Sequence, residues 1–552
     1  MLEIQQLNIS FKNNIVIENL SFSIEKKQII GMVGESGSGK SISSLAIMGL
    51  LPKNASLNGK ILFNNNNLTS YTNKQFQKIR GNEISMIFQE PMSSLNPTLT
   101  CGYQVSEVLK LHSNLSSTEI KEEALSIFEK VKLPNPKQIY SSYPHQISGG
   151  QKQRVMIAIA IACKPKLLIA DEPTTALDVT VQKEIIKLLK EIQQESEMSI
   201  LFISHDLALV SEIADKIVVM YKGKVVEKGT KKDVFVYPKK DYTKALINSK
   251  PKLSARLKKL PTVFDFMNNN VDLSIYSQES RAVFHKKLYH QPPLLEIIHL
   301  NKQFISNSSF FRTPKITHAV NDVSFKIYEG ETLGLVGESG CGKTTLGRTI
   351  LQLEKPTSGQ IIYKGKDILK LKKREIQNLR KEIQIIFQDP FSSLNPRITI
   401  GEAILEPMRV HRILPSKTTR KEYVIKLLKK VGLSENHFHR YPHEFSGGQR
   451  QRIGIARTIA LQPKLIVCDE SVSALDVSVQ AQVLNLLNHL KSEFNFTYIF
   501  ISHDLSVVKY MADQLIVMNK GKIEEIDDAD IIYRNPKTEY TKTLIDAIPK
   551  GI

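Results

Sequence analysis

Short apolar runs alternate with helical patterns along the chain. Four of these runs form two matching pairs, Leu167–Ala170 with Leu465–Cys468 and Ile200–Ile203 with Tyr498–Ile501. Runs this short and this uniformly apolar predict strands buried on both faces, as in a parallel sheet covered by helices. Ligands of such sheets gather at the carboxyl ends of the strands, so we expect the chemistry of this protein there.

Helical patterns lie between the predicted strands. Ser116 and Glu119 have the spacing of a capping box, and Thr419 with Glu422 is the expected counterpart in the second half. The longest apolar run, Val155–Cys163, has nine residues. It is too short to span a bilayer, which takes about 20 residues, and predicts a buried helix. After Ser116, apolar residues recur at helical spacing at Ile120, Ala124, Ile127 and Val131.

The sequence repeats itself over nearly its whole length. Leu2-Glu3-Ile4 matches Leu295-Glu296-Ile297, and from Ser148 to His205 the spacing between matching residues stays at 298. Two copies of a domain of roughly 250 residues explain this pattern. We expect a first domain with its tail at 1–254, a linker at 255–290 rich in Lys, Asn and Ser, and a second domain with its tail at 291–552.

Each copy contains the pattern G-x-x-x-x-G-K-[ST]. The glycines let backbone N–H groups surround phosphates, the lysine reaches the outer phosphates, and the last hydroxyl is suited to Mg²⁺. The chain is therefore expected to bind two nucleoside triphosphates with Mg²⁺. The first loop consists of Gly34, Glu35, Ser36, Gly37, Ser38, Gly39, Lys40 and Ser41. The second consists of Gly337, Glu338, Ser339, Gly340, Cys341, Gly342, Lys343 and Thr344.

An acidic pair ends one buried strand in each copy. Asp171-Glu172 and Asp469-Glu470 follow the apolar runs directly. In isolation such a pair is more often an ordinary strand end. Downstream of a phosphate loop, and present twice, it predicts an aspartate that holds Mg²⁺ and a glutamate that polarises the attacking water.

A second phosphate-contacting motif occurs in both copies. Ser-Gly-Gly offers backbone donors at a helix start together with a hydroxyl, although one such tripeptide alone would be only a turn. Both motifs follow Tyr-Pro-His and precede a helix rich in Gln and basic residues, which makes the pattern specific. The residues are Ser148, Gly149, Gly150 and Gln151, and Ser446, Gly447, Gly448 and Gln449.

Together these motifs resemble the nucleotide-binding subunits of ATP-binding cassette (ABC) transporters, over both copies. The resemblance implies an α/β fold of two tandem P-loop ATPase domains, each with a mainly parallel sheet core, an antiparallel β subdomain and a helical subdomain. It implies that Gln89 and Gln388 touch metal and water, that His205 and His503 contact the γ-phosphate, and that Ala176-Leu177-Asp178 and Ala474-Leu475-Asp476 cross the dimer interface. Phe11 and Phe304 are the adenine-stacking candidates, although an aromatic residue at a strand end is often core. The metal set is Ser41, Gln89 and Asp171, and Thr344, Gln388 and Asp469.

In this family each ATP lies between one phosphate loop and the Ser-Gly-Gly motif of the opposite cassette. The resemblance therefore implies one site with Lys40, Asp171 and Glu172 facing Ser446 and Gly448. The other site has Lys343, Asp469 and Glu470 facing Ser148 and Gly150. Ser471 stands where the first copy has Pro173, which is a reason to expect unequal rates.

The long glutamine loops Met86–Pro97 and Ile385–Pro396 resemble the branch that imports dipeptides, oligopeptides, nickel or glutathione. The tails beginning at Pro238 and Pro536 also resemble that branch. The resemblance implies ATP hydrolysis that drives import through two integral-membrane permease subunits, with an extracytoplasmic solute-binding protein. The chain would sit peripherally on the cytoplasmic face of a bacterial inner membrane. Residues 238–290 contain no cysteine, so no iron–sulfur cluster is expected there.

Composition leaves a competing function open. The net charge of +20 suits nucleic acid, an anionic membrane surface or an anionic ligand, and equally a solvated lysine-rich surface. A soluble twin-cassette ATPase acting on ribosomes or nucleic acid is therefore the alternative, and an exporter ATPase a third. The importer-type tails argue against the first alternative and the glutamine-loop pattern argues against the second, so we expect no nucleic-acid partner. The four cysteines are expected to be free thiols. The sequence does not name the cargo.

Overall fold

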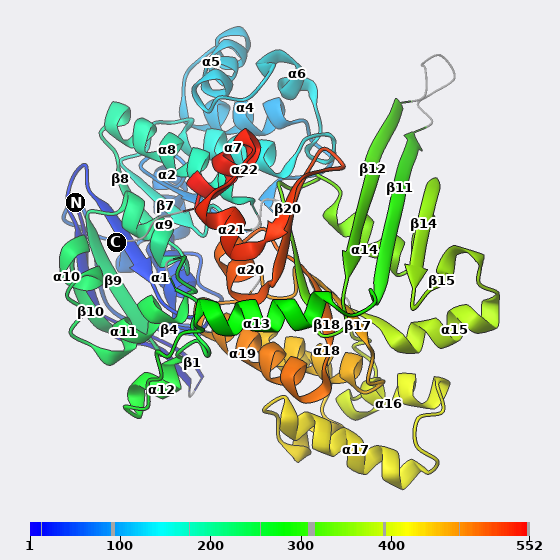
Figure 1. The fold of residues 1–552 in the computed structure, drawn as a ribbon. Helices are drawn as coiled ribbons and strands as arrows, with labels where there is room; N and C mark the ends of the chain where they lie inside the picture. Colours follow the sequence, from blue (N-terminus) through cyan, green and yellow to red (C-terminus); the bar gives the residue numbers. More distant parts are fainter. Residues whose placement is uncertain are drawn as a thin grey trace. The chain divides into compact units, whose positions relative to one another are not determined.

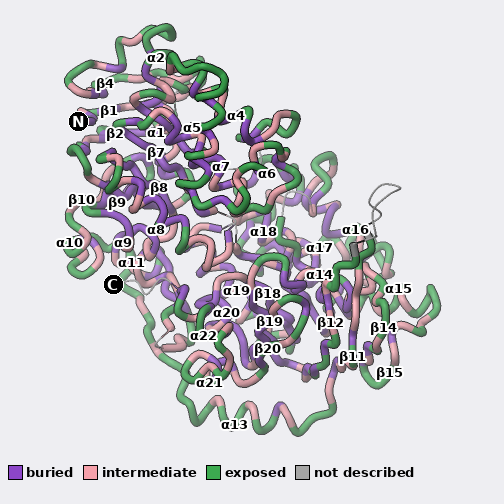
Figure 2. The backbone as a smooth tube through the Cα atoms, turned by 90° about the horizontal axis from the view of Figure 1, so that it is seen from above, coloured by how far each residue is buried: buried purple, intermediate pink, exposed green. Residues whose placement is uncertain are grey.

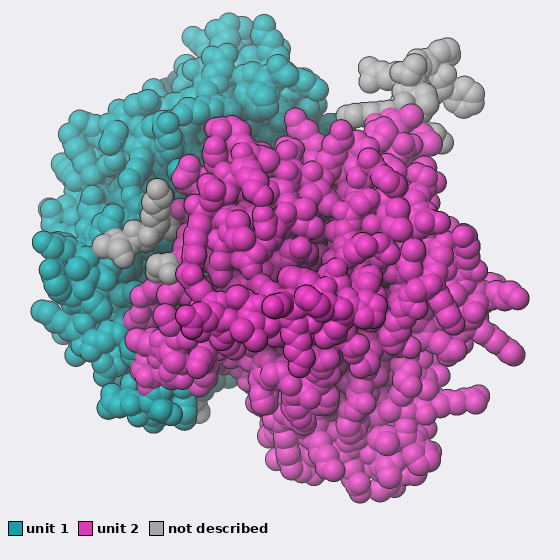
Figure 3. Space-filling model, viewed as in Figure 1, with its two compact units in different colours: residues 1–247, 263–270, 549–552 teal, residues 248–262, 271–548 magenta. Residues whose placement is uncertain are grey.

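The computed structural model describes residues 1–12, 14–89, 94–175, 177–253, 255–306, 315–389, 393–473 and 475–548. It consists of two compact units (Figure 3). The first comprises residues 1–247 and 263–270, and the second comprises residues 248–262 and 271–548. Each unit is described below by itself.

The first unit contains a six-stranded sheet in the order β10-β9-β3-β8-β7-β6. Strands β6, β7, β8, β3 and β9 are parallel, and β10 pairs antiparallel with β9 at the edge. Every residue of β3, β7 and β8 is buried, as expected for strands covered on both faces. The strands are β3 (Ile29–Val33), β6 (Ile84–Ile87), β7 (Leu167–Asp171), β8 (Ser199–Ile203), β9 (Lys216–Tyr221) and β10 (Lys224–Thr230).

A separate antiparallel sheet in the order β2-β1-β4-β5 belongs to the same unit. It consists of β1 (Leu2–Phe11), β2 (Asn14–Ile24), β4 (Ala55–Phe63) and β5 (Asn66–Asn67). The helices of the unit are α1 (Lys40–Ile47), α2 (Asn73–Ile79), α4 (Cys101–His112), α5 (Ser117–Lys130), α6 (Pro136–Ser141), α7 (Gly149–Ile161), α8 (Val179–Ser196), α9 (Leu207–Ile213), α10 (Lys231–Phe235), α11 (Asp241–Ser249) and α12 (Val263–Met267). The short 3₁₀ turns η1 (Leu68–Ser70) and η2 (Pro144–Gln146) complete it.

The second unit repeats this architecture. Its six-stranded sheet has the order β16-β17-β18-β13-β19-β20, again with one antiparallel edge strand, β20. Its antiparallel sheet has the order β12-β11-β14-β15, with the long strands β11 and β12 side by side (Figure 1), and buried residues of both strands pack in one core with β13, α14 and β17. The strands are β11 (Leu295–Ser306), β12 (Lys315–Ile327), β13 (Thr332–Val336), β14 (Ser358–Tyr363), β15 (Lys366–Asp367), β16 (Ile383–Ile386), β17 (Leu465–Asp469), β18 (Thr497–Ile501), β19 (Gln514–Asn519) and β20 (Lys522–Asp528).

The helices of the second unit include one that precedes its first strand, α13 (Gln278–Tyr289). The others are α14 (Lys343–Ile350), α15 (Lys373–Glu382), α16 (Ile400–Val410), α17 (Lys417–Lys430), α18 (Gly447–Ile459), α19 (Val477–Phe494), α20 (Leu505–Met511), α21 (Ala529–Arg534) and α22 (Glu539–Asp546). The 3₁₀ turns are η3 (Ile368–Lys370), η4 (Glu435–His439) and η5 (Pro442–Glu444).

The α/β class and the division of each copy into a parallel core, an antiparallel sheet and a helical insertion are confirmed. The four apolar runs are the buried strands β7, β8, β17 and β18. The apolar run from Val155 falls in α7 and is largely buried. Within the described residues, no helix combines the length and the apolarity that crossing a membrane requires.

The two expected capping boxes have different outcomes. Ser116 and Glu119 form the predicted box at the start of α5. The prediction for Thr419 with Glu422 is wrong, because α17 begins three residues earlier, with Ser416 as N-cap and Thr419 as its partner. Serine accepts from the third backbone N–H of the helix as readily as threonine does, so the earlier residue takes the cap.

The stretch between the copies is structured where it is described. α12 belongs to the first unit, whereas 248–262 and 271–290 belong to the second. Figure 2 shows α13 with intermediate and exposed residues along most of its length, as expected for a helix lying on a surface. The domain limits expected from the sequence remain a prediction. Residues 307–314, between β11 and β12, lie outside the described residues.

Candidate functional site

Four loops of the first unit meet at the carboxyl edge of its parallel sheet. The phosphate loop follows β3, Gln89 follows β6, Glu172 follows β7 and His205 follows β8. Because these four strands are parallel neighbours in the sheet, their following loops share one edge. The second unit places Gln388, Glu470 and His503 after β16, β17 and β18 in the same way.

The lysine of each phosphate loop binds carbonyl oxygens at the start of the same loop. Lys40 Nζ donates to the carbonyl oxygens of Gly34 at 2.7 Å and Glu35 at 2.9 Å. Lys343 repeats both contacts in the second unit, to Gly337 at 2.7 Å and Glu338 at 2.8 Å. The lysine ammonium therefore bridges the two ends of each loop, at the start of α1 or α14. An anion bound there is stabilised by the helix dipole.

Glycine is required by the backbone of these loops. Gly39 and Gly342 cap α1 and α14 in the left-handed region, with φ of 101° and 108°. A Cβ on Gly342 would lie 2.0 Å from the carbonyl oxygen of Ala319, which cannot move aside. Around Gly37 and Gly340, by contrast, the added carbon would meet no atom of the described part of the chain within 4 Å. The loop thus leaves open space beside its middle glycine, as a cradle for phosphate needs.

The predicted catalytic glutamate lies at the centre of the first cluster. Glu172 Oε2 accepts from Gln89 Nε2 at 3.1 Å and Thr175 Oγ1 at 2.9 Å, and lies 3.1 Å from His205 Nδ1. Burial opposes its ionisation, but the hydrogen bond and charge of His205 outweigh burial and lower the pKa of Glu172 to about 2. The carboxylate is therefore ionised at neutral pH.

The second cluster has the same arrangement. Glu470 Oε2 accepts from Gln388 Nε2 at 2.7 Å and lies 3.4 Å from His503 Nδ1. Burial opposes the charge of both groups, yet their mutual contact lowers the pKa of Glu470 and raises the pKa of His503. Both units therefore bring together the glutamate, glutamine and histidine that the sequence suggested.

The backbone at both glutamates is strained. Glu172 has φ of 48° and Glu470 has φ of 47°, a region that non-glycine residues rarely adopt. Their backbone N–H groups donate to Ile203 and Ile501 of the adjacent strands at 2.9 Å, which holds the turn in this conformation. The two glutamates thus occupy the same kind of turn directly after their strands.

The aspartates before them are buried and suited to a cation. Burial raises the pKa of Asp171 to about 6 and also raises that of Asp469. Among the described residues, Asp171 Oδ1 is buried without a hydrogen-bond partner, whereas Asp469 Oδ1 accepts from Thr344 Oγ1 at 3.1 Å. A buried carboxylate oxygen beside a hydroxyl is a donor set that fits Mg²⁺.

The Ser-Gly-Gly motifs begin helices. Ser148 caps α7, accepting from Gln151 N at 3.3 Å, while Gln151 Oε1 accepts from Ser148 N at 2.9 Å. Ser446 and Gln449 form the same capping box on α18. The facing of these motifs toward the opposite phosphate loop stays a prediction, because each unit is described separately.

Other predicted residues are placed as follows. Phe11 is the last residue of β1 and is partly buried against the hydrophobic core of the first unit. Phe304 lies in β11 and is 42% exposed. Adenine stacking at these rings stays a prediction. Asp178 caps α8. Ala176, Ala474 and parts of both glutamine loops, 90–93 and 390–392, lie outside the described residues. All four cysteines are free, as expected.

The structure adds one residue in each unit that the motifs did not assign to the site. Tyr242 OH accepts from the backbone N–H of Glu35 at 3.2 Å, and Tyr540 OH accepts from Glu338 N at 3.1 Å. Both tyrosines come from the C-terminal tails that marked the importer branch. Their matching positions in the two tails were a signal in the sequence, but nothing there connected them to the phosphate loops.

Two phosphate loops, each with an acidic strand end, a glutamine and a histidine, define a twin ATP-binding cassette ATPase. The ABC transporter family profile matches residues 17–175 and 320–473. The profile of the oligopeptide/dipeptide transporter C-terminal region matches 226–271 and 524–551. The chain belongs to the dipeptide, oligopeptide and glutathione-type branch of ABC importer ATPases.

Two curated relatives carry the same name, glutathione import ATP-binding protein GsiA. Those of Shigella sonnei (strain Ss046) and Escherichia coli (strain K12) are each 45% identical over 563 residues. The alignment covers 100% of this chain and 89% of each relative. Among solved structures, the dimeric ATP-binding cassette MJ0796 in a post-hydrolysis state with ADP and Pi is 28% identical. That match covers 43% of this chain and 98% of the other, with a TM-score of 0.39.

Proposed function

We propose that this chain hydrolyses ATP to drive uptake of glutathione or a related short peptide through separate membrane permease subunits. The observation that supports this most is full-length similarity to relatives named for glutathione import, combined with two intact glutamate–histidine–glutamine clusters. The comparisons give no support to the alternative of action on ribosomes or nucleic acid.

The proposed chemistry is attack of water on the γ-phosphate of ATP, with Glu172 and Glu470 as proton acceptors. A carboxylate with a pKa near 2 is a weak base, because base strength falls with pKa. We therefore propose that His205 and His503 leave the glutamates for the γ-phosphate when ATP binds. Removing that donor raises the basicity of the carboxylate at the moment when water must be deprotonated.

Mg²⁺ would be held by Ser41, Asp171 and Gln89 in one site and by Thr344, Asp469 and Gln388 in the other. When bound, it would neutralise charge on the β- and γ-phosphates. The buried, unpartnered oxygen of Asp171 supports this role. Each phosphate loop is proposed to work with the Ser-Gly-Gly motif of the other cassette, so that ATP closes the two halves and hydrolysis reopens them.

A groove of about 360 Å³ in the second unit supports docking of a permease segment. Leu353 and Phe387, which line it, are 54% and 43% exposed, and Phe387 immediately precedes Gln388. A permease segment seated there would contact Phe387, the residue before Gln388 in the sequence. Movement of the permease segment would therefore follow ATP turnover. The chain would then sit peripherally on the inner face of the membrane, with a solute-binding protein delivering cargo outside.

The test is uptake of labelled glutathione in cells that lack this chain. The wild-type chain should restore uptake, and the Glu172→Gln/Glu470→Gln variant should not. Leu353→Asp should lose co-purification with the integral-membrane subunits, while Ile316→Asp, changed at a similarly exposed site (52%), should keep it. Normal uptake without the chain, or equal co-purification of both variants, would contradict the proposal.

A further inference from the structure

A basic groove of about 530 Å³ lies in the second unit, away from the nucleotide-binding residues. One side is formed by the segment that precedes this cassette, through Lys258, Lys259 and Tyr276. The other side comes from the cassette itself and includes Lys430, Arg452 and His489. The groove therefore exists only because the inter-cassette segment lies against the second cassette.

The segment is fixed to α19 by a two-point backbone contact. Asn485 Oδ1 accepts from Leu260 N at 2.9 Å, and its Nδ2 donates to Leu260 O at 2.8 Å. Two passes of the segment also pair with each other around the bridge between Leu257 and Ile275. Lys258 N donates to Ser274 O at 2.8 Å, and Tyr276 N donates to Arg256 O at 3.0 Å. The residues on this side of the groove are thus set on ordered backbone.

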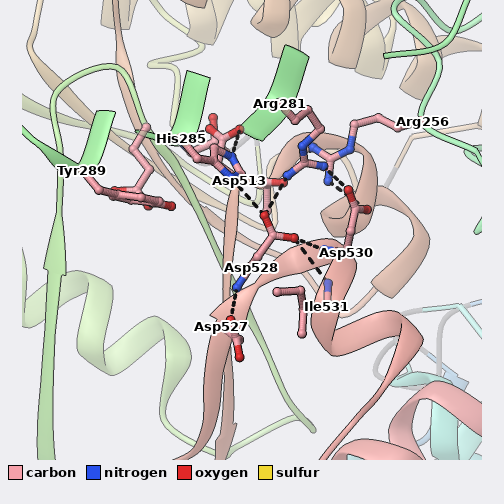
Figure 4. Close-up of polar contacts among 12 residues, drawn as sticks. Arg256, Arg281, His285, Tyr289, Asp513, Asp527, Asp528, Asp530 and Ile531 are labelled. Carbon is pink, nitrogen blue, oxygen red and sulfur yellow. Dashed lines mark hydrogen bonds and ion pairs between the residues drawn. The ribbon is translucent and has the colours of Figure 1, made fainter. Parts of the chain in front are cut away.

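A buried ionic cluster fastens the rest of the segment (Figure 4). Arg281 binds Asp530, and its Nη2 also lies 3.4 Å from Asp528 Oδ2. His285 Nδ1 lies 3.1 Å from the same Asp528 oxygen. Arg256 Nη1 donates to Ala512 O at 2.8 Å. Ordering the segment in advance removes an entropy cost that a ligand would otherwise have to meet.

The matching surface of the first cassette carries paired charges. There Arg154 pairs with Glu184 at 2.6 Å, and Lys132 pairs with Glu191 at 2.5 Å. Gln482 and His489 occupy the positions of the two glutamates in the second copy. Arg452, the counterpart of Arg154, binds the amide of Gln482 in place of a carboxylate.

Not every charge changes in the same direction. Lys132, Lys187 and Lys190 of the first copy are Gly432, Asn485 and Asn488 in the second, so this face has lost lysines as well as glutamates. The ion pair Lys430–Glu493 is kept and matches Lys130–Glu195. The second copy has thus replaced Glu184 by an amide and Glu191 by His489, whose Nε2 lies 3.8 Å from Glu493 Oε2, and it has received two further lysines from the segment.

Cations and amide donors around a preformed groove suit an anion. Arginine and lysine give charge-assisted hydrogen bonds to phosphate or carboxylate oxygens. Tyr276, 49% exposed, offers a ring face at the rim. We propose that this groove binds a small polyanion bearing phosphate or carboxylate groups, at a site separate from the two ATP sites.

The test exploits the absence of tryptophan from the chain. Tyr276→Trp places a single indole at the groove of the full-length protein. Its emission is followed during titration with sodium tripolyphosphate and, separately, sodium citrate, at constant ionic strength. A saturable change with either anion is expected, and the anion that binds more tightly tells whether phosphate or carboxylate is the recognised group.

Matched variants assign the signal to the groove. Lys258→Gln/Lys259→Gln should weaken binding at least tenfold, whereas Lys286→Gln/Lys287→Gln, with the same charge change on the exposed face of α13, should stay within twofold. His489→Glu, which restores the residue type of the first copy, should also weaken binding at least tenfold. Tripolyphosphate held by the phosphate loops would be unaffected by these changes. No saturable response, or equal affinity in both lysine pairs and in His489→Glu, would overturn the proposal.

Discussion

His205 Nδ1 lies 3.1 Å from Glu172 Oε2, and this contact joins the ends of two adjacent strands. The pair recurs as His503 and Glu470 at 3.4 Å. The histidine thus contacts the same carboxylate that is proposed to accept the proton of the attacking water. Under the proposed mechanism, this contact is a resting arrangement that changes before hydrolysis.

Replacing both glutamates tests their role as proton acceptors. Glu172→Gln/Glu470→Gln keeps the shape of the side chain and removes the base, so ATPase turnover should fall roughly 10²- to 10⁴-fold. ATP binding should persist, because Lys40 and Lys343 are untouched. Phosphate release and filter binding of labelled ATP measure the two properties. Sustained hydrolysis would show that other groups act as the bases.

The tail tyrosines should support nucleotide binding more than chemistry. Tyr242→Phe or Tyr540→Phe removes the hydroxyl that accepts from the phosphate loop, at a cost of about 1 kcal/mol, or roughly fivefold in Kd. The kcat of the site should change little. Tyr237→Phe, 63% exposed, is the matched control. Unchanged ATP affinity in both tail variants would show that the loop needs no such support.

The glycines of the second phosphate loop should respond differently to alanine. Gly342→Ala forces a Cβ against the carbonyl of Ala319, so both thermal stability and ATP affinity should fall. Gly340→Ala meets open space, and its left-handed φ of 81° should cost only about 1–2 kcal/mol. It should therefore leave a folded protein that binds ATP poorly. Calorimetric melting and ATP titration distinguish the two, and equal losses of stability would contradict the prediction.

The buried cluster predicts a pH dependence of stability in the second unit. Burial lowers the pKa of His285. The contacts with Asp513 and Asp528 raise it by more, so the net pKa rises to about 9. The protonated histidine therefore stabilises the fold fully below its unfolded pKa of about 6.5, and this contribution is lost as pH rises through 9. Chemical denaturation should show wild type losing about 1–3 kcal/mol across that window relative to His285→Gln.

The titration of Glu331 limits the pH range in which wild type and His285→Gln can be compared. Burial raises the pKa of Glu331 to about 7, so measurements from pH 7.5 to 9 keep its titration apart. Subtracting the curve of His285→Gln cancels the titrations that both proteins share. Parallel curves for the two proteins would show that His285 contributes no pH-dependent stability.

The repeat, the buried strands and the residue types of the candidate site could all be predicted from the sequence. These features are local, because a glycine-rich turn, an apolar run and an acidic strand end each follow from a few adjacent residues. The carboxyl ends of parallel neighbouring strands share one edge of the sheet, and the resemblance to ABC ATPases placed Gln89, Glu172 and His205 in one site before their contacts were known.

Contacts between residues that lie far apart in the sequence became clear only from the folded structure. Tyr242 supports Glu35 from 207 residues away, and Arg256 reaches Ala512 across 256 residues. Neither contact has a local pattern, because each depends on where folded elements come to lie. The segment between the copies looked like a plain linker for the same reason. Its basic residues acquire partners only after the second cassette has folded and presents Asp528 and Asp530.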